Sequence, residues 1–298
     1  MKPYHVILVG VTYTAACEFA LRQAHQIAQK SGAKLLAFHA VRPVEIDEVV
    51  KCCAIERDLM IDSAQNSLEA FVERALGSNH HVTCLVNEGE PYHEFSNLAN
   101  ESGADLVIIG ADHFSNSTRD SGNFSIKSLR SFTMPVLLVR EQPNRPFARL
   151  SACIDFSNST TPVLEHTARL DFNENQFVEI VHASCTHGSG PSPLRFLTGF
   201  FSTREKKEQY HEILDGQLSA IKNSSSHLFQ AAPITTALEH EDPATALIEH
   251  LEKSHSELAI LGCSRGGLKG FKTNLLGGTA EALIHQTHCS ILIVPILP

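Results

Sequence analysis

The chain lacks any run of apolar residues long enough to cross a lipid bilayer. The stretch from Met1 to Gly10 also lacks the hydrophobic region and cleavage site of a secretory signal, so we expect it to form a first β-strand. Basic residues are outnumbered: the net charge is −9, which argues against a general nucleic-acid binder. These absences predict a cytoplasmic protein that has no membrane span and no nucleic acid among its partners.

The eight cysteines lack the paired spacing of a disulfide framework or a structural zinc site. We therefore expect reduced and mostly buried thiols. The group to test for a metal is Cys185-Thr186-His187 with His182 nearby, but it has no second pair of ligands at zinc-finger spacing. The other histidines occur mostly singly and are expected on the surface or hydrogen-bonded in the core. No metal is predicted.

The chain repeats itself, and the repeat defines the fold class. Phe38-His39-Ala40 and Val181-His182-Ala183 each end an apolar run, 143 residues apart. Each half alternates apolar strands with helical patterns, which predicts an α/β protein with two tandem, doubly wound, five-stranded parallel sheets. The expected strands lie near 5–11, 34–41, 82–87, 105–110 and 135–140, and near 149–155, 177–183, 234–240, 257–262 and 290–295.

Two irregular tracts bound the domains and the loops. The segment from Glu141 to Pro146 contains two prolines, which disfavour a helix, and we expect a linker there between domains at 1–142 and 146–298. The tract at 184–192 follows the second strand of the second half. It is expected to be either a lid over a site or a surface loop that contacts a partner, and the sequence leaves both open.

The two halves differ most after their fourth strands. The first half has one glycine before the next helix, Gly122, and it carries Asp112 and Asp120, whose carboxylates would repel an anion. The second half has no acidic residue until Glu281, and backbone N–H groups of a glycine-rich loop and a helix start can bind phosphate. The second half is therefore the predicted phosphate binder. Its glycines are Gly262, Gly266, Gly267, Gly270, Gly277 and Gly278.

The loop does not match the common nucleotide motifs. Phe271 separates Gly270 from Lys272, which excludes a Walker loop, and the dinucleotide fingerprint after a first strand is absent. The first strand of the second half instead ends in Asp155, where the first half has Thr12. A carboxylate at this switch point can accept a hydrogen bond from a nucleobase or a ribose. The alternative is a helix cap, for which Ser159 or Thr160 would be better placed.

This pattern resembles the universal stress protein family. The signature of that family is a Gly-x2-Gly-x9-Gly-[Ser/Thr] loop after the fourth strand, with an aspartate at the end of the first strand. The likeness is carried by 261–268 (LGCSRGGL), 276–281 (LGGTAE) and 289–294 (CSILIV). The tandem layout looks most like the E-type members of bacteria. The resemblance implies Rossmann-like halves with strand order 3-2-1-4-5 that pair as a pseudo-dimer.

The resemblance also implies a site and a function. Asp155 and Ala183 would meet the adenine, while the remaining positions would line the ribose and phosphates: Gly262, Arg265, Gly266, Gly277, Gly278 and Thr279. The implied protein is a stress-response regulator that binds ATP or a related adenine nucleotide, with or without Mg²⁺. It would also bind a protein partner of unknown identity, and a homodimer stays open. No catalytic residue is expected, because the loop offers no acid for phosphoryl transfer. The alternatives are a weak ATPase, or a scaffold or binder of another ligand with both halves degenerate.

Overall fold

The chain folds into two compact units, Lys2–Pro146 and Phe147–Pro298. The computed structural model describes residues 2–42, 54–78, 81–111, 132–141, 144–172, 174–185, 204–264 and 277–296. The tract at 184–192, expected as a lid or a surface loop, falls outside these residues from 186 on. The first-half loop with Asp112, Asp120 and Gly122, together with the helix expected after it, also lies outside them.

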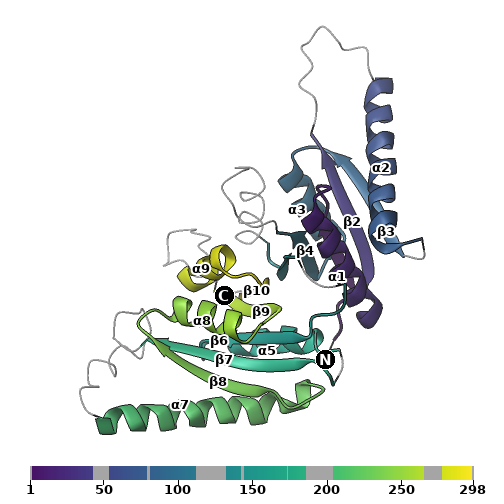
Figure 1. Cartoon of the computed structure of the whole chain (residues 1–298). Coiled ribbons are helices and arrows are strands. Elements are labelled where there is room, and N and C mark those ends of the chain that lie inside the picture. The colour runs from purple at the N-terminus through teal and green to yellow at the C-terminus, as the bar shows by residue number, and fades with distance from the viewer. Residues whose placement is uncertain are drawn as a thin grey trace. The chain divides into compact units, whose positions relative to one another are not determined.

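The first unit alternates strands and helices along the chain. Its helices are labelled in Figure 1, where α1 and α2 lie beside one another and α3 contacts β2. Its described elements are β1 (Val6–Gly10), α1 (Ala15–Ser31), β2 (Lys34–Val41), α2 (Ala54–Leu76), β3 (Val82–Glu88), α3 (Pro91–Glu101), β4 (Leu106–Gly110) and β5 (Val136–Val139).

The second unit repeats this alternation. Figure 1 shows α8 beside α9, and α7 alongside β8. Its described elements are β6 (Arg149–Ile154), α5 (Thr160–Arg169), β7 (Phe177–Cys185), α7 (Arg204–Ser225), a short 3₁₀ turn (Ser226–Leu228), β8 (Ile234–His240), α8 (Pro243–Lys253), β9 (Leu258–Ser264), α9 (Gly278–Gln286) and β10 (Ser290–Ile296).

Within each unit all five described strands are parallel. The order is β3-β2-β1-β4-β5 in the first unit and β8-β7-β6-β9-β10 in the second. Both correspond to the expected 3-2-1-4-5, and each expected strand overlaps an observed one. The fold class read from the repeat is therefore confirmed. The order reverses beside β1 and beside β6, which places a switch point at the carboxyl end of each of these strands.

The central strands form the core because helices cover both faces of a parallel sheet. The side chains of Ile7, Leu8 and Val9 in β1 are fully buried, as are Ala259 and Ile260 in β9. The outer strands β3 and β8 contain only exposed and partly buried residues, as expected at the edges of a sheet.

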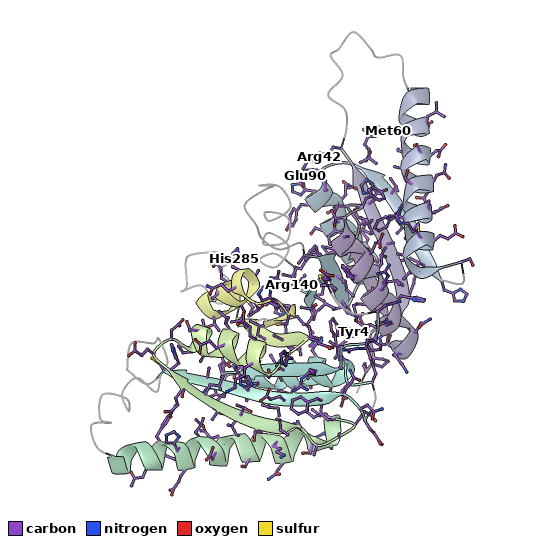
Figure 2. All side chains as sticks on the ribbon, viewed as in Figure 1. Tyr4, Arg42, Met60, Glu90, Arg140 and His285 are labelled. Carbon is purple, nitrogen blue, oxygen red and sulfur yellow. The ribbon has the colours of Figure 1, made fainter. Side chains whose placement is uncertain are left out.

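Two pairs of carboxylates accept backbone hydrogen bonds at equivalent positions of the two units. Glu90 (Figure 2) and Asp242 cap α3 and α8, each followed by proline in the first helical turn. Both helices begin at these residues because a carboxylate accepts from the free N–H groups there and proline suits the first turn. At the opposite edge, Asp105 accepts from the backbone N–H of His5 at 2.9 Å, and Glu257 accepts from that of Ala148.

Candidate functional site

The carboxyl edge of the second sheet holds the described members of the expected site. Asp155 follows the last residue of β6, and Gly262 lies near the end of β9. A helix that connects two parallel strands begins at the edge where the first strand ends. The first turn of α9, with Gly278 and Thr279, therefore belongs to this same edge. Arg265 and Gly266 lie outside the described residues.

Ala183, the last residue of its expected strand, lies within β7. The strand continues to Cys185, and Ala183 pairs with Leu238 of β8. On the other side, β6 ends at Ile154, which pairs with His182. In the described part of the chain, β7 thus extends past β6, and Asp155 follows at the point where the two strands part.

Asp155 organises the turn that leads from β6 into α5. Its Oδ1 atom accepts hydrogen bonds from the Ser157 backbone N–H at 3.0 Å, the Ser157 hydroxyl at 2.6 Å and the Ser159 hydroxyl at 2.9 Å. Partial burial acts to raise the pKa of Asp155, but these hydrogen bonds outweigh it and lower the pKa below its ordinary value. Asp155 is therefore ionised at neutral pH. The same residue stabilises the turn and places a negative charge at the carboxyl edge of the second sheet.

Sequence reasoning correctly named Ser159 as a cap residue of α5, but it missed what the Ser159 side chain binds. Ser159 occupies the cap position of α5, yet it makes no side-chain bond to the helix N–H groups. Its hydroxyl donates to Asp155 instead. The carboxylate therefore has a structural role as well as the ligand role that the sequence suggested, and that ligand role stays a prediction.

The equivalent turn of the first unit carries no charge. Its acceptor is the thiol of Cys17, which lies near the Thr12 backbone N–H at 3.3 Å and accepts from the Thr14 hydroxyl at 3.4 Å. A thiol and two threonines thus replace a carboxylate and two serines. Both turns hold an aromatic residue at positive φ, Tyr13 and Phe156, but only the second contains a carboxylate, so the two edges differ chemically.

Gly262 is required by packing inside the protein. A Cβ atom on Gly262 would lie 2.4 Å from the Cβ of Ser159, closer than real contacts allow. Gly110, its equivalent in the first unit, would meet backbone atoms of Ala16 at 2.5 Å. Both glycines let the first helix of the unit approach the end of the fourth strand. Repetition of this glycine in both halves therefore follows from the fold, whatever Gly262 contributes to a ligand.

Gly277 and Gly278 have no such explanation. Among the described residues, a Cβ atom at either position would meet no atom within 4 Å, and both residues are exposed together with Thr279. Gly277 has φ −58° and ψ 146°, a conformation open to any residue, and neither glycine has a positive φ. Neither packing against the described residues nor backbone conformation therefore requires glycine at positions 277 and 278. The N-cap of α9 is Gly277, which has no side chain to accept from the first N–H groups of the helix.

Two residues that the sequence argument did not assign to the nucleotide site, Phe156 and His182, stand beside Asp155. The Phe156 ring packs against His182, with centroids 4.3 Å apart, and His182 Nδ1 lies 2.9 Å from the Ile154 carbonyl oxygen. Phe156 has φ +55°, an unusual conformation for a side chain of this size. The repeated Phe38-His39-Ala40 and Val181-His182-Ala183 could have pointed to this histidine, but the sequence does not show which residues surround it.

The described residues show neither a metal cluster nor a membrane helix. Among them, no three or more His, Cys, Asp or Glu side chains gather so as to hold a metal ion. Thr186 and His187, named with Cys185 as the group to test, lie outside this part of the chain. A helix long and apolar enough to span a bilayer is likewise missing from the helices that the structure describes.

Comparison with known proteins identifies the family. The model of the universal stress protein family matches the chain twice, at 3–140 and at 146–295. The chain therefore belongs to the universal stress protein family, as a tandem member with two such units. No curated protein matches the chain.

Solved structures share the fold over the whole length. A universal stress protein from Archaeoglobus fulgidus DSM 4304 is 15% identical, with a TM-score of 0.68 over 97% of this chain and 98% of that one. A functionally unknown protein from Pseudomonas aeruginosa PAO1 is 16% identical, with a TM-score of 0.62 over 99% and 93%. A universal stress protein solved in complex with cAMP is 22% identical and covers 46% of this chain and 98% of its own, with a TM-score of 0.36.

Proposed function

We propose that the second half of this universal stress protein binds an adenine nucleotide, ATP or a close relative, and that the chain acts through it as a stress-response regulator. The observation that carries the proposal is the open space at Gly277 and Gly278. Within the described part of the chain, neither a packing contact nor a positive φ accounts for these two consecutive glycines. An anion held against the backbone is a reason to exclude side chains there.

The charges give the nucleotide its orientation. Asp155 is ionised and would repel phosphate, so it suits the base or ribose end, where it can accept hydrogen bonds. The first turn of α9 offers N–H donors and the positive end of a helix dipole, so it suits the phosphates. The hydroxyl of Thr279, exposed in that turn, can donate to the same anion.

The first half is the degenerate partner in this proposal. Its turn after β1 is neutral, with Cys17 in place of the carboxylate, and Tyr13 covers His39 with ring centroids 4.6 Å apart. The Tyr13 hydroxyl also donates to the Ala64 carbonyl oxygen of α2 at 3.4 Å. The proposed division therefore assigns nucleotide binding to 146–298 and a supporting role to 1–142.

Binding of fluorescent ATP to the full chain tests the proposal. Asp155→Ala and Gly277→Val are each expected to weaken binding at least about tenfold, because each removes or blocks one end of the site. Gly277→Val should lower the free energy of unfolding by no more than about 1 kcal/mol, because its side chain meets no described residue and only the N-cap preference for glycine over valine is lost. Thr12→Ala, the first-half counterpart of Asp155→Ala, is the matched control and should bind as wild type does. Equal affinity in all four proteins would refute the proposed site.

A further inference from the structure

Each unit holds the histidine of its second strand in one setting. His182 Nδ1 lies 2.9 Å from the Ile154 carbonyl oxygen, and His39 Nδ1 lies 2.8 Å from that of Val11. A carbonyl oxygen only accepts, so Nδ1 carries the proton in both rings. The Nε2 atom of the neutral imidazole is then a hydrogen-bond acceptor. The protonation pattern of His182 therefore follows from its position on β7.

An aromatic residue in a left-handed conformation packs on each histidine. Phe156 with φ +55° contacts His182, and Tyr13 with φ +59° contacts His39. This backbone conformation is energetically unfavourable for a residue with a side chain. In the first unit Tyr13 is also fastened to α2, through its hydroxyl and edge-on to Phe71. Among the described residues, Phe156 has no ring partner besides His182, so the second pair is not tied to a neighbouring helix in this way.

The surroundings keep His182 neutral. Burial lowers the pKa of His182, and it outweighs the opposing effects of the Ile154 carbonyl and of the Asp155 carboxylate. Nε2 has no hydrogen-bond partner among the described residues, and it does not belong to their buried, unpartnered polar atoms. It is therefore open to solvent. Asp155 uses only Oδ1 within the turn, which leaves Oδ2 as a second acceptor nearby.

We propose that His182 is a specificity-determining residue, whose Nε2 acceptor, held in place by Phe156 beside Asp155, selects a heterocycle that presents an amino group. The inference rests on the proposed nucleotide site and states which part of the ligand, the amino group of the base, His182 and Asp155 recognise. A 6-aminopurine offers two N–H donors to these two acceptors. A 6-oxopurine would set a carbonyl oxygen against them, leaving lone pairs opposed and unsatisfied, which disfavours its binding.

Calorimetric titration of the full chain with ATP and with inosine triphosphate tests this. Inosine triphosphate has a carbonyl oxygen in place of the adenine amino group. Wild type is expected to prefer ATP at least about tenfold. His182→Asn keeps an amide donor near the Ile154 carbonyl but removes Nε2, so its preference should fall to about twofold or less. His39→Asn makes the same change in the first unit and should keep the full preference.

The outcomes separate the inference from the function on which it rests. Wild-type protein that binds both nucleotides equally would overturn the inference and leave nucleotide binding intact, whereas binding of neither would overturn both. Retention of the full preference by His182→Asn would also overturn it. Nitrogen-15 NMR of the wild-type imidazoles gives a test without a variant of His182. The Nε2 resonance of His182 should move when ATP is added, that of His39 should not, and an unmoved His182 signal contradicts the inference.

Discussion

Gly110→Ala is expected to lower the free energy of unfolding of the first unit by about 3 kcal/mol. The new Cβ would lie 2.5–2.7 Å from the Ala16 carbonyl group and the Cys17 nitrogen, which are backbone atoms of the first turn of α1. The helix itself must move, because no side-chain rotation relieves the contact. Urea denaturation monitored by circular dichroism measures the loss. An unchanged midpoint would show that α1 can withdraw from β4 without cost.

Gly262→Ala provides the matched comparison in the second unit. Its nearest atoms belong to the Ser159 side chain, with Cβ at 2.4 Å and Oγ at 2.8 Å. Ser159→Gly removes both atoms, so it should recover about 1–2 kcal/mol of the loss when combined with Gly262→Ala. Ala16→Gly should recover nothing in Gly110→Ala. Gly216→Ala in α7, where a Cβ meets open space, is the control and should raise stability by up to about 1 kcal/mol.

The stability of the second unit is expected to fall by roughly 2.5 kcal/mol between pH 7 and pH 4.5 through His166 alone. Burial, followed by the positive charge of Arg169, lowers the pKa of His166 to about 4 from an ordinary 6.5. Between these two values the unfolded chain binds a proton that the folded chain does not. The stabilisation is therefore complete above pH 6.5 and is lost as the pH falls towards 4.

Unfolding free energies of wild type and His166→Gln, measured across this range, isolate the effect. The difference between the two proteins should change by roughly 2.5 kcal/mol from pH 7 to pH 4.5, because carboxylates that titrate in this range are common to both. A pH-independent difference for His166→Gln would mean that His166 is protonated as readily in the folded chain as in the unfolded one.

The fold could be predicted from the sequence because its signals are local and repeated. Apolar runs such as 106–110 and 258–264 alternate with amphipathic segments, and proline follows an acidic residue at the start of both α3 and α8. Two copies of the same pattern in one chain made each strand easier to recognise. Strand order followed from the family likeness, which the matches at 3–140 and 146–295 confirm.

The site was predictable only in part. The position of Asp155 at the end of β6 follows from the pattern, yet its bonds to Ser157 and Ser159 depend on how the turn folds back. The roles of the glycines were harder to predict, because nothing in the sequence distinguishes a glycine required by packing, such as Gly262, from one that is not, such as Gly277. One is needed where α5 presses against β9, and the other stands in open space. Only distances between segments far apart in sequence distinguish the two.

The sequence by itself determined the two α/β units and the family, because hydrophobic period and glycine placement are properties of neighbouring residues. The tertiary structure alone decided which glycines serve packing, which nitrogen of His182 holds the proton, and why the first-unit turn is neutral. Those properties depend on atoms brought together across strands, such as the Ile154 carbonyl beside His182 and Ser159 beside Gly262. Such contacts between residues far apart in the chain form only when the protein folds, so the sequence alone does not reveal them.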